Sequence, residues 1–140
     1  MELARWLVFS VAFITGIGGL LADYFLASGT QHIKNPRWPP HAKFHNAQTI
    51  LMGVLLALFS IALLFQHRVL SRENLILSAA LASLYWLGIF AAPIFPGTAF
   101  FDPEFATGAP NVGRMPLQLA IGFVLVAILL AAVAVGFLWS

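Results

Sequence analysis

The chain has 140 residues, of which 61% are hydrophobic and only 9% are charged, with a formal net charge of +2. Soluble domains are about a quarter charged, so this composition indicates an integral membrane protein. The absence of cysteine excludes disulfides, iron–sulfur clusters and thiolate ligation of a metal. The few basic residues are scattered, which excludes a nucleic-acid-binding surface.

The first apolar run covers residues 5–27 and exceeds the ~20 residues that cross a bilayer as a helix. It carries Asp23 and Tyr24 near its end and is followed by no small-residue cleavage motif, so we interpret it as a retained helix and not as a signal peptide. An ionisable side chain in a membrane segment is costly and is therefore a functional candidate. The alternative role for Asp23 is to bond water or to cap a neighbouring backbone at the interface.

The second helix is predicted over residues 40–66, because the proline pair that ends the loop 28–40 suits a first helical turn. His41, His45 and Gln48 follow at positions i, i+4 and i+7 and so share one face of this helix. Asn46 lies about 100° from that stripe. His45 is the deeper histidine and the better candidate for a ligand, an acid–base group or a substrate contact.

Two histidines without a glutamate fall short of the zinc motif HExxH. A three-ligand metal site would need Asp23 to approach His41 and His45. A haem needs only one neutral imidazole and an apolar slot, which favours His45 as its ligand.

The third helix is predicted over residues 75–95 and has Tyr85 and Trp86 in its middle, as packing residues or as substrate contacts. Residues 96–115 are rich in phenylalanine, glycine and proline. We expect this loop to fold back over the helices as a cap.

The fourth helix is predicted over residues 116–139, where Ala127, Ala131 and Ala134 give a small-residue face that favours close helix contact. The whole chain, 1–140, is thus predicted to be one all-α transmembrane domain, a four-helix bundle.

An even number of helices puts both termini on one side of the membrane, together with the short turn between the second and third helices. Basic residues occur on both sides. The arginines of the terminal side flank a plain short turn, so we expect the termini in the cytoplasm and the protein in a bacterial inner membrane. The residues of the terminal side are Arg5, Arg68 and Arg72, and those of the loop side are Lys34, Arg37, Lys43 and Arg114.

With this order of helices, the chain resembles styrene oxide isomerase, a small four-helix membrane enzyme. The resemblance rests on the second helix HAKFHNAQTILMG, on a third helix that ends in a Phe/Pro-rich segment, and on the loop ATGAPNVGR. It implies a trimer that binds haem b through a histidine at the start of the second helix and opens an epoxide to an aldehyde, with ferric iron as Lewis acid. Leu51 replaces that family's asparagine, and its tyrosine falls near Ile89, one turn from Tyr85.

The string ADYF…NPRWPPHAKFHNAQT also looks like a family of small bacterial membrane proteins, and that likeness implies no mechanism. Our first hypothesis is an isomerase in the lipid bilayer that acts on a small lipophilic substrate, with haem b at the interface of a homo-oligomer. The alternative is a non-catalytic binding or accessory subunit. The predicted site consists of His45 as metal ligand, His41 beside the cofactor, and Tyr85, Asn46, Gln48 and Asp23 around the substrate.

Overall fold

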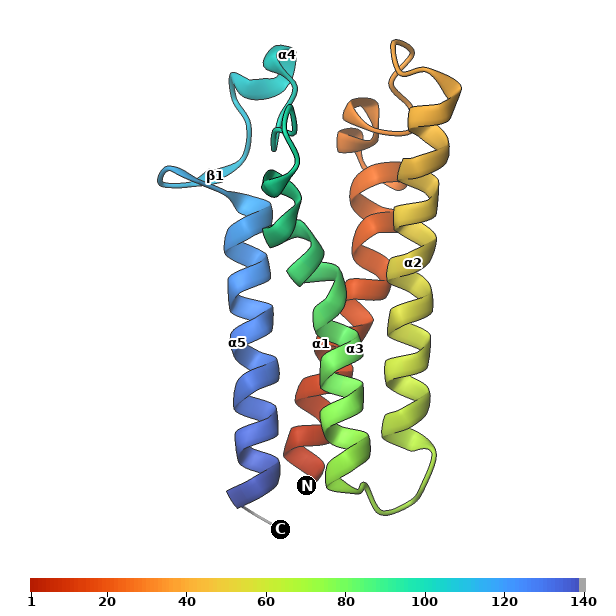
Figure 1. Ribbon diagram of the computed structural model, residues 1–140, viewed down its shortest axis with the longest axis vertical. Coiled ribbons are helices and arrows are strands. Elements are labelled where there is room, and N and C mark those ends of the chain that lie inside the picture. Colours follow the sequence, from red (N-terminus) through yellow and green to blue (C-terminus); the bar gives the residue numbers. More distant parts are fainter. Residues whose placement is uncertain (139–140) are drawn as a thin grey trace.

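Four long helices dominate the computed structural model, which describes residues 1–138 (Figure 1). Each is long and apolar enough to cross a membrane. The protein is therefore an all-α membrane four-helix bundle, as predicted. The helices are α1 (Glu2–Leu20), α2 (Pro40–Phe65), α3 (Arg72–Ala91) and α5 (Leu117–Leu138). Residue 139, the expected end of the fourth helix, lies outside the described residues.

Helices α1 and α3 contact each other in the middle of the bundle, and α2 and α5 each pack against both (Figure 1). Small residues allow these contacts to be close: a Cβ on Gly16 of α1 would lie only 2.8 Å from the Cβ of Ala57 on α2. Between apolar helices in lipid, such close packing is a main source of association. Fully buried side chains between the helices include Val8, Val11, Leu64 and Leu75.

The helices begin where local chemistry favours a start. Pro40 occupies the first turn of α2, where its missing N–H costs nothing. Ser71 caps α3, because its side chain accepts a hydrogen bond of 3.1 Å from the backbone N–H of Asn74. Both ends of the described chain lie at the same end of the bundle, opposite the two long loops (Figure 1).

Helix α1 changes its winding before it ends. Residues Leu21–Phe25 form a π-helical turn, η1, in which the backbone N–H of Leu26 bonds the carbonyl of Leu21 five residues earlier at 2.8 Å. Such turns are rare and frequently occur at functional sites. A 3₁₀ helix, η2 (Ala27–Gln31), continues the chain into the first loop. The π turn carries Asp23, the one acidic residue of the first span beyond its first turn.

The second long loop holds several short elements above the bundle. Helix α3 passes into the 3₁₀ helix η3 (Ala92–Ile94), and the chain then forms α4 (Pro103–Ala106). A two-stranded hairpin follows, β1 (Asn111–Val112) paired antiparallel with β2 (Met115–Pro116). An ion pair between Arg37 and Glu104 joins the first loop to α4. The two loops are thereby linked at one end of the molecule.

Candidate functional site

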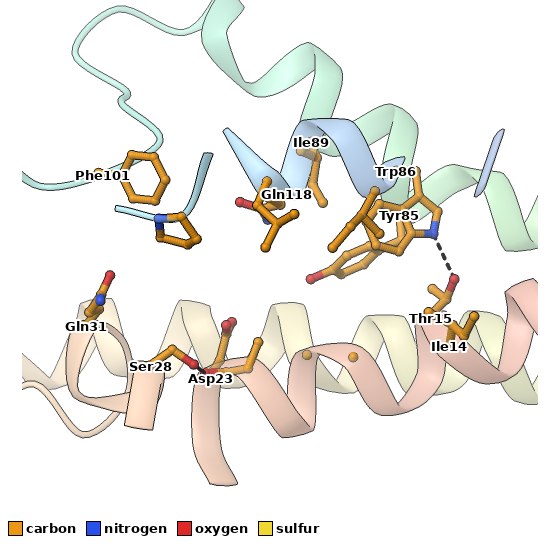
Figure 2. A pocket seen from close by; sticks show the side chains of 16 residues that line it. Ile14, Thr15, Asp23, Ser28, Gln31, Tyr85, Trp86, Ile89, Phe101 and Gln118 are labelled. Atoms are coloured by element: carbon orange, nitrogen blue, oxygen red, sulfur yellow. Dashed lines mark hydrogen bonds between the residues drawn. The ribbon is translucent and has the colours of Figure 1, made fainter. Parts of the chain in front are cut away.

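A cavity of about 360 Å³ opens at the loop end of the bundle, between the end of α1, the second half of α3 and the start of α5 (Figure 2). Its volume falls within the range of about 300–1,000 Å³ that small-molecule sites occupy. Most of its lining is apolar, with a few polar side chains. The apolar side chains include Ile14, Trp86, Ile89, Phe101, Leu117 and Ile121, and the polar ones are Thr15, Asp23, Ser28, Gln31, Tyr85 and Gln118.

A buried hydrogen bond closes the deep end of the cavity. The indole N–H of Trp86 on α3 donates to the hydroxyl oxygen of Thr15 on α1 at 2.8 Å (Figure 2). The Thr15 hydroxyl in turn donates to the carbonyl of Val11 at 2.9 Å. Phe101, from the loop expected to cap the bundle, lines the opposite end (Figure 2). A hydrogen bond between α1 and α3 therefore closes the deep end of the cavity, and an aromatic ring from the second loop lines its other end.

Asp23 projects into this cavity from the π turn, and its side chain is only 15% exposed. The side-chain amide of Asn46 on α2 donates a hydrogen bond of 2.8 Å to one carboxylate oxygen. The ring Nε2 of His32 lies 3.5 Å from the other oxygen. The structure thus brings together Asp23 and Asn46, and it adds His32, which the sequence analysis did not single out.

Tyr85 lies across the cavity from Asp23, on α3 (Figure 2). Its ring packs over two glycines: a Cβ on Gly53 would lie 3.4 Å from the ring, and a Cβ on Gly19 would lie 3.7 Å from the hydroxyl. Among the described residues, no side chain or carbonyl bonds that hydroxyl, which points into the open space (Figure 2). The carbonyl oxygen of the Asn46 side chain is also buried without a partner.

His41, His45 and Gln48 lie apart from the cavity, on the exposed outer face of α2. The Nε2 atoms of the two histidines are 3.1 Å apart, and Nδ1 of His45 is 3.2 Å from the side-chain oxygen of Gln48. The predicted site residues therefore form two groups. One group faces inward and contains Asp23, Asn46 and Tyr85, and the other faces outward and contains the three residues of the stripe.

A haem on His45 would not occupy the cavity described above, because neither His41 nor His45 lines it. Both ring nitrogens of His45 already have partners. No group of three or more His, Cys, Asp or Glu side chains that could hold a metal occurs in residues 1–138. This cavity does not give His45 a haem slot, so we tie the haem prediction to walls supplied by a second copy.

Two further residues, Thr15 and Gln118, line the cavity from α1 and α5 and were not predicted from the sequence. Both are polar residues inside long apolar runs. Polar side chains in such runs usually face the protein interior, so this signal was available. The hydrogen bond between Trp86 and Thr15, which closes the deep end of the cavity, joins positions 71 residues apart and has no signature in the sequence.

The sequence profile of a family of unknown function, DUF6640, matches residues 7–132, and the chain belongs to that family. No curated protein and no solved structure matches the chain.

Proposed function

We propose that this member of a family without an assigned activity is a membrane enzyme that isomerises a small, lipophilic, oxygen-containing substrate by proton transfer. The observation that carries the proposal is a carboxylate, Asp23, that faces an apolar cavity across from the unpartnered hydroxyl of Tyr85. A carboxylate in a membrane segment is costly, which favours a functional reason for its presence.

The apolar walls would bind the hydrocarbon part of the substrate, and the polar side chains would orient its oxygen. Tyr85 has a free O–H donor, and Gln118 has an amide that reaches the same cavity from α5. Hydrogen bonds from such donors stabilise negative charge that develops on a carbonyl oxygen.

Asp23 would then act as the acid–base group. Its carboxylate takes a proton from a carbon next to the oxygen-bearing carbon, the electron pair moves to form a conjugated enolate, and the proton returns to another carbon. The reaction consumes nothing else, so the cavity needs no second substrate. The bond from Asn46 holds the carboxylate in place during both transfers.

Deuterium exchange tests this proposal. Purified protein in mild detergent is incubated in deuterium oxide with a β,γ-unsaturated cyclic ketone, and mass spectrometry measures deuterium uptake and double-bond migration. We expect both to exceed the rates without protein. Tight binding of the ketone with no exchange would instead support the alternative, a non-catalytic binding or accessory subunit.

A haem b-dependent epoxide isomerase with His45 as the iron ligand is the second candidate. The observation that favours it is the exposed histidine stripe at the start of α2, where Gln48 holds the His45 ring. The haem would supply a Lewis acid for epoxide opening, and a neighbouring copy would supply the walls. An absorption spectrum of haem-supplemented protein tests this: a Soret band and conversion of styrene oxide to an aldehyde are expected, and a colourless folded protein excludes it.

We also propose that the protein is a homo-oligomer, by resemblance a trimer. Ala127, Ala131 and Ala134 of α5 are exposed in the single chain, so their small face is available to a second copy. Native mass spectrometry in several mild detergents should show the oligomer, and Ala131→Leu should weaken it more than Leu130→Ala. A monomer in every detergent contradicts the proposal.

For the membrane itself we propose the bacterial inner membrane, with both termini in the cytoplasm. The cavity then opens towards the periplasmic side. A fluorescent protein fused to the C-terminus should fold and fluoresce, whereas an alkaline phosphatase fusion should be inactive. The reverse pattern would invert the orientation.

A further inference from the structure

The histidine pair on the outer face of α2 has the geometry of a chelate. His41 and His45 are one helical turn apart, and their Nε2 atoms are separated by 3.1 Å. Imidazole nitrogens bind Zn²⁺ at about 2.0–2.1 Å, so the nitrogen–metal–nitrogen angle at a cation shared by both rings would be roughly 95–100°. That angle lies between the ~90° of an octahedral and the ~109° of a tetrahedral cation. A shared cation lies off the line between the two nitrogens, so the two rings can hold it once each ring turns its Nε2 towards it.

Gln48 sets the tautomer that such a site requires. The side-chain oxygen of Gln48 can only accept a hydrogen bond, so the His45 Nδ1 beside it at 3.2 Å carries the proton. In a neutral ring, Nε2 then has a free lone pair, and this lone pair points at His41. A hydrogen bond on the second ring nitrogen is the usual device that orients a metal-binding histidine.

The surroundings permit a cation to approach. Both histidines are exposed, and they lie in the first two turns of α2, where the span begins and water is near. Lys43, the nearest cationic side chain in the sequence, lies about 160° around the helix axis from each histidine. Because His45 accepts through its Nε2, the hydrogen between the two nitrogens belongs to His41, and His41 must move this proton to its Nδ1 before a cation binds both Nε2 atoms.

We propose that His41 and His45 chelate one divalent transition-metal cation, with water in its remaining coordination positions. Imidazole ligands suit Cu²⁺, Ni²⁺ and Zn²⁺, whereas Mg²⁺ and Ca²⁺ prefer oxygen. This site is separate from the cavity and does not depend on the enzyme activity proposed above.

Isothermal titration of the full-length, tag-free protein in mild detergent tests the site with Cu²⁺, Zn²⁺ and Mg²⁺ in turn. We expect one cation per chain, tighter binding of Cu²⁺ than of Zn²⁺, and no heat from Mg²⁺. His41→Ala and His45→Ala should each abolish that binding. Gln48→Leu should weaken it by about tenfold or more, because the His45 ring loses its orienting bond.

Two control variants and one spectrum complete the test. His32→Ala and His67→Ala should bind cations like the parent protein, because His32 lies against Asp23 and Trp38 and His67 lies beyond the opposite end of α2. Electron paramagnetic resonance of the Cu²⁺-loaded parent should show two bound nitrogens, a result that needs no variant to fold. Unchanged Cu²⁺ affinity in either histidine variant overturns the proposal. A Soret band that is lost in His45→Ala but kept in His41→Ala also overturns it, because His45 would then be a haem ligand.

Discussion

The first turns of α2 carry polar side chains on two faces that meet different surroundings. On the inner face, Asn46 bonds the carboxylate of Asp23 beside a cavity. On the outer face, His41, His45 and Gln48 bond one another and are exposed. The inner face is therefore fixed by tertiary contacts, whereas the outer face forms its geometry within a single helix. Only the inner face depends on the fold for its chemistry.

The largest effect is expected from Asp23→Asn. This change keeps the shape and the acceptor for Asn46 but removes the base, so deuterium exchange should fall by about 100- to 10,000-fold. Binding of Cu²⁺ to the outer histidines should stay the same. Asp102→Asn, on an exposed carboxylate of the second loop, is the control. Exchange that survives in Asp23→Asn would remove the inner face from catalysis.

A smaller loss is expected from Asn46→Leu, because the change removes a hydrogen bond to a charged group. Such bonds contribute about 1.5–3 kcal/mol, so exchange should fall by about tenfold to a hundredfold. Gln48→Leu is the matched change on the outer face and should leave exchange intact while weakening Cu²⁺ binding. Equal loss of exchange in both variants would show that the two faces act together.

Tyr85→Phe should lower the exchange rate by about two- to tenfold, since it removes one neutral donor worth about 0.5–1.5 kcal/mol. The apolar ring stays in place over Gly53, so the bundle should melt at nearly the same temperature. Tyr24→Phe, on an exposed tyrosine, is the control. The rate is measured by the same mass-spectrometric assay, and an unchanged rate would leave Tyr85 a packing residue.

The smallest effect is expected from His41→Ala on the cavity. Distant sites without shared partners add independently, so the exchange rate should change by less than about twofold. The same protein should lose its Cu²⁺. A large drop in exchange would mean that the outer face contributes to the cavity through a second copy of the chain.

The four helices can be predicted from the sequence, because a long apolar run in a membrane satisfies its backbone polar groups by forming the hydrogen bonds of a helix. The expected ranges lie within a few residues of the observed spans. Asp23 was also identifiable, since a carboxylate in such a run stands out. The orientation of α2 was harder. Spacing at i, i+4 and i+7 identifies residues that share one face of a helix, but it does not say which face points into the bundle.

Small residues on α2 carried the missing information. Gly53, Ala57 and Ser60 are buried and follow Asn46 at helical spacing, so they mark the inner face. The histidine stripe continues through Met52 and Leu55, which are exposed. In a membrane protein the small residues, and not the large apolar ones, indicate where helices meet. The cavity itself depends on contacts between α1, α3 and α5 that no local pattern records.

The π turn at Leu21–Phe25 is equivalent to one extra residue inserted into an α-helix. Each residue of an α-helix advances the chain by about 100° around the axis. Removing one residue, for example Ala22, would restore a regular α-helical turn, and the segments before and after it would keep their relative orientation because the π turn absorbs its extra residue within one turn. Asp23 lies inside that turn, so its carboxylate would change direction relative to α3. The position of Asp23 therefore depends on the length of this helix as much as on its composition, and a single-residue deletion would act on the site without changing any of the residues that line it on α3 or α5.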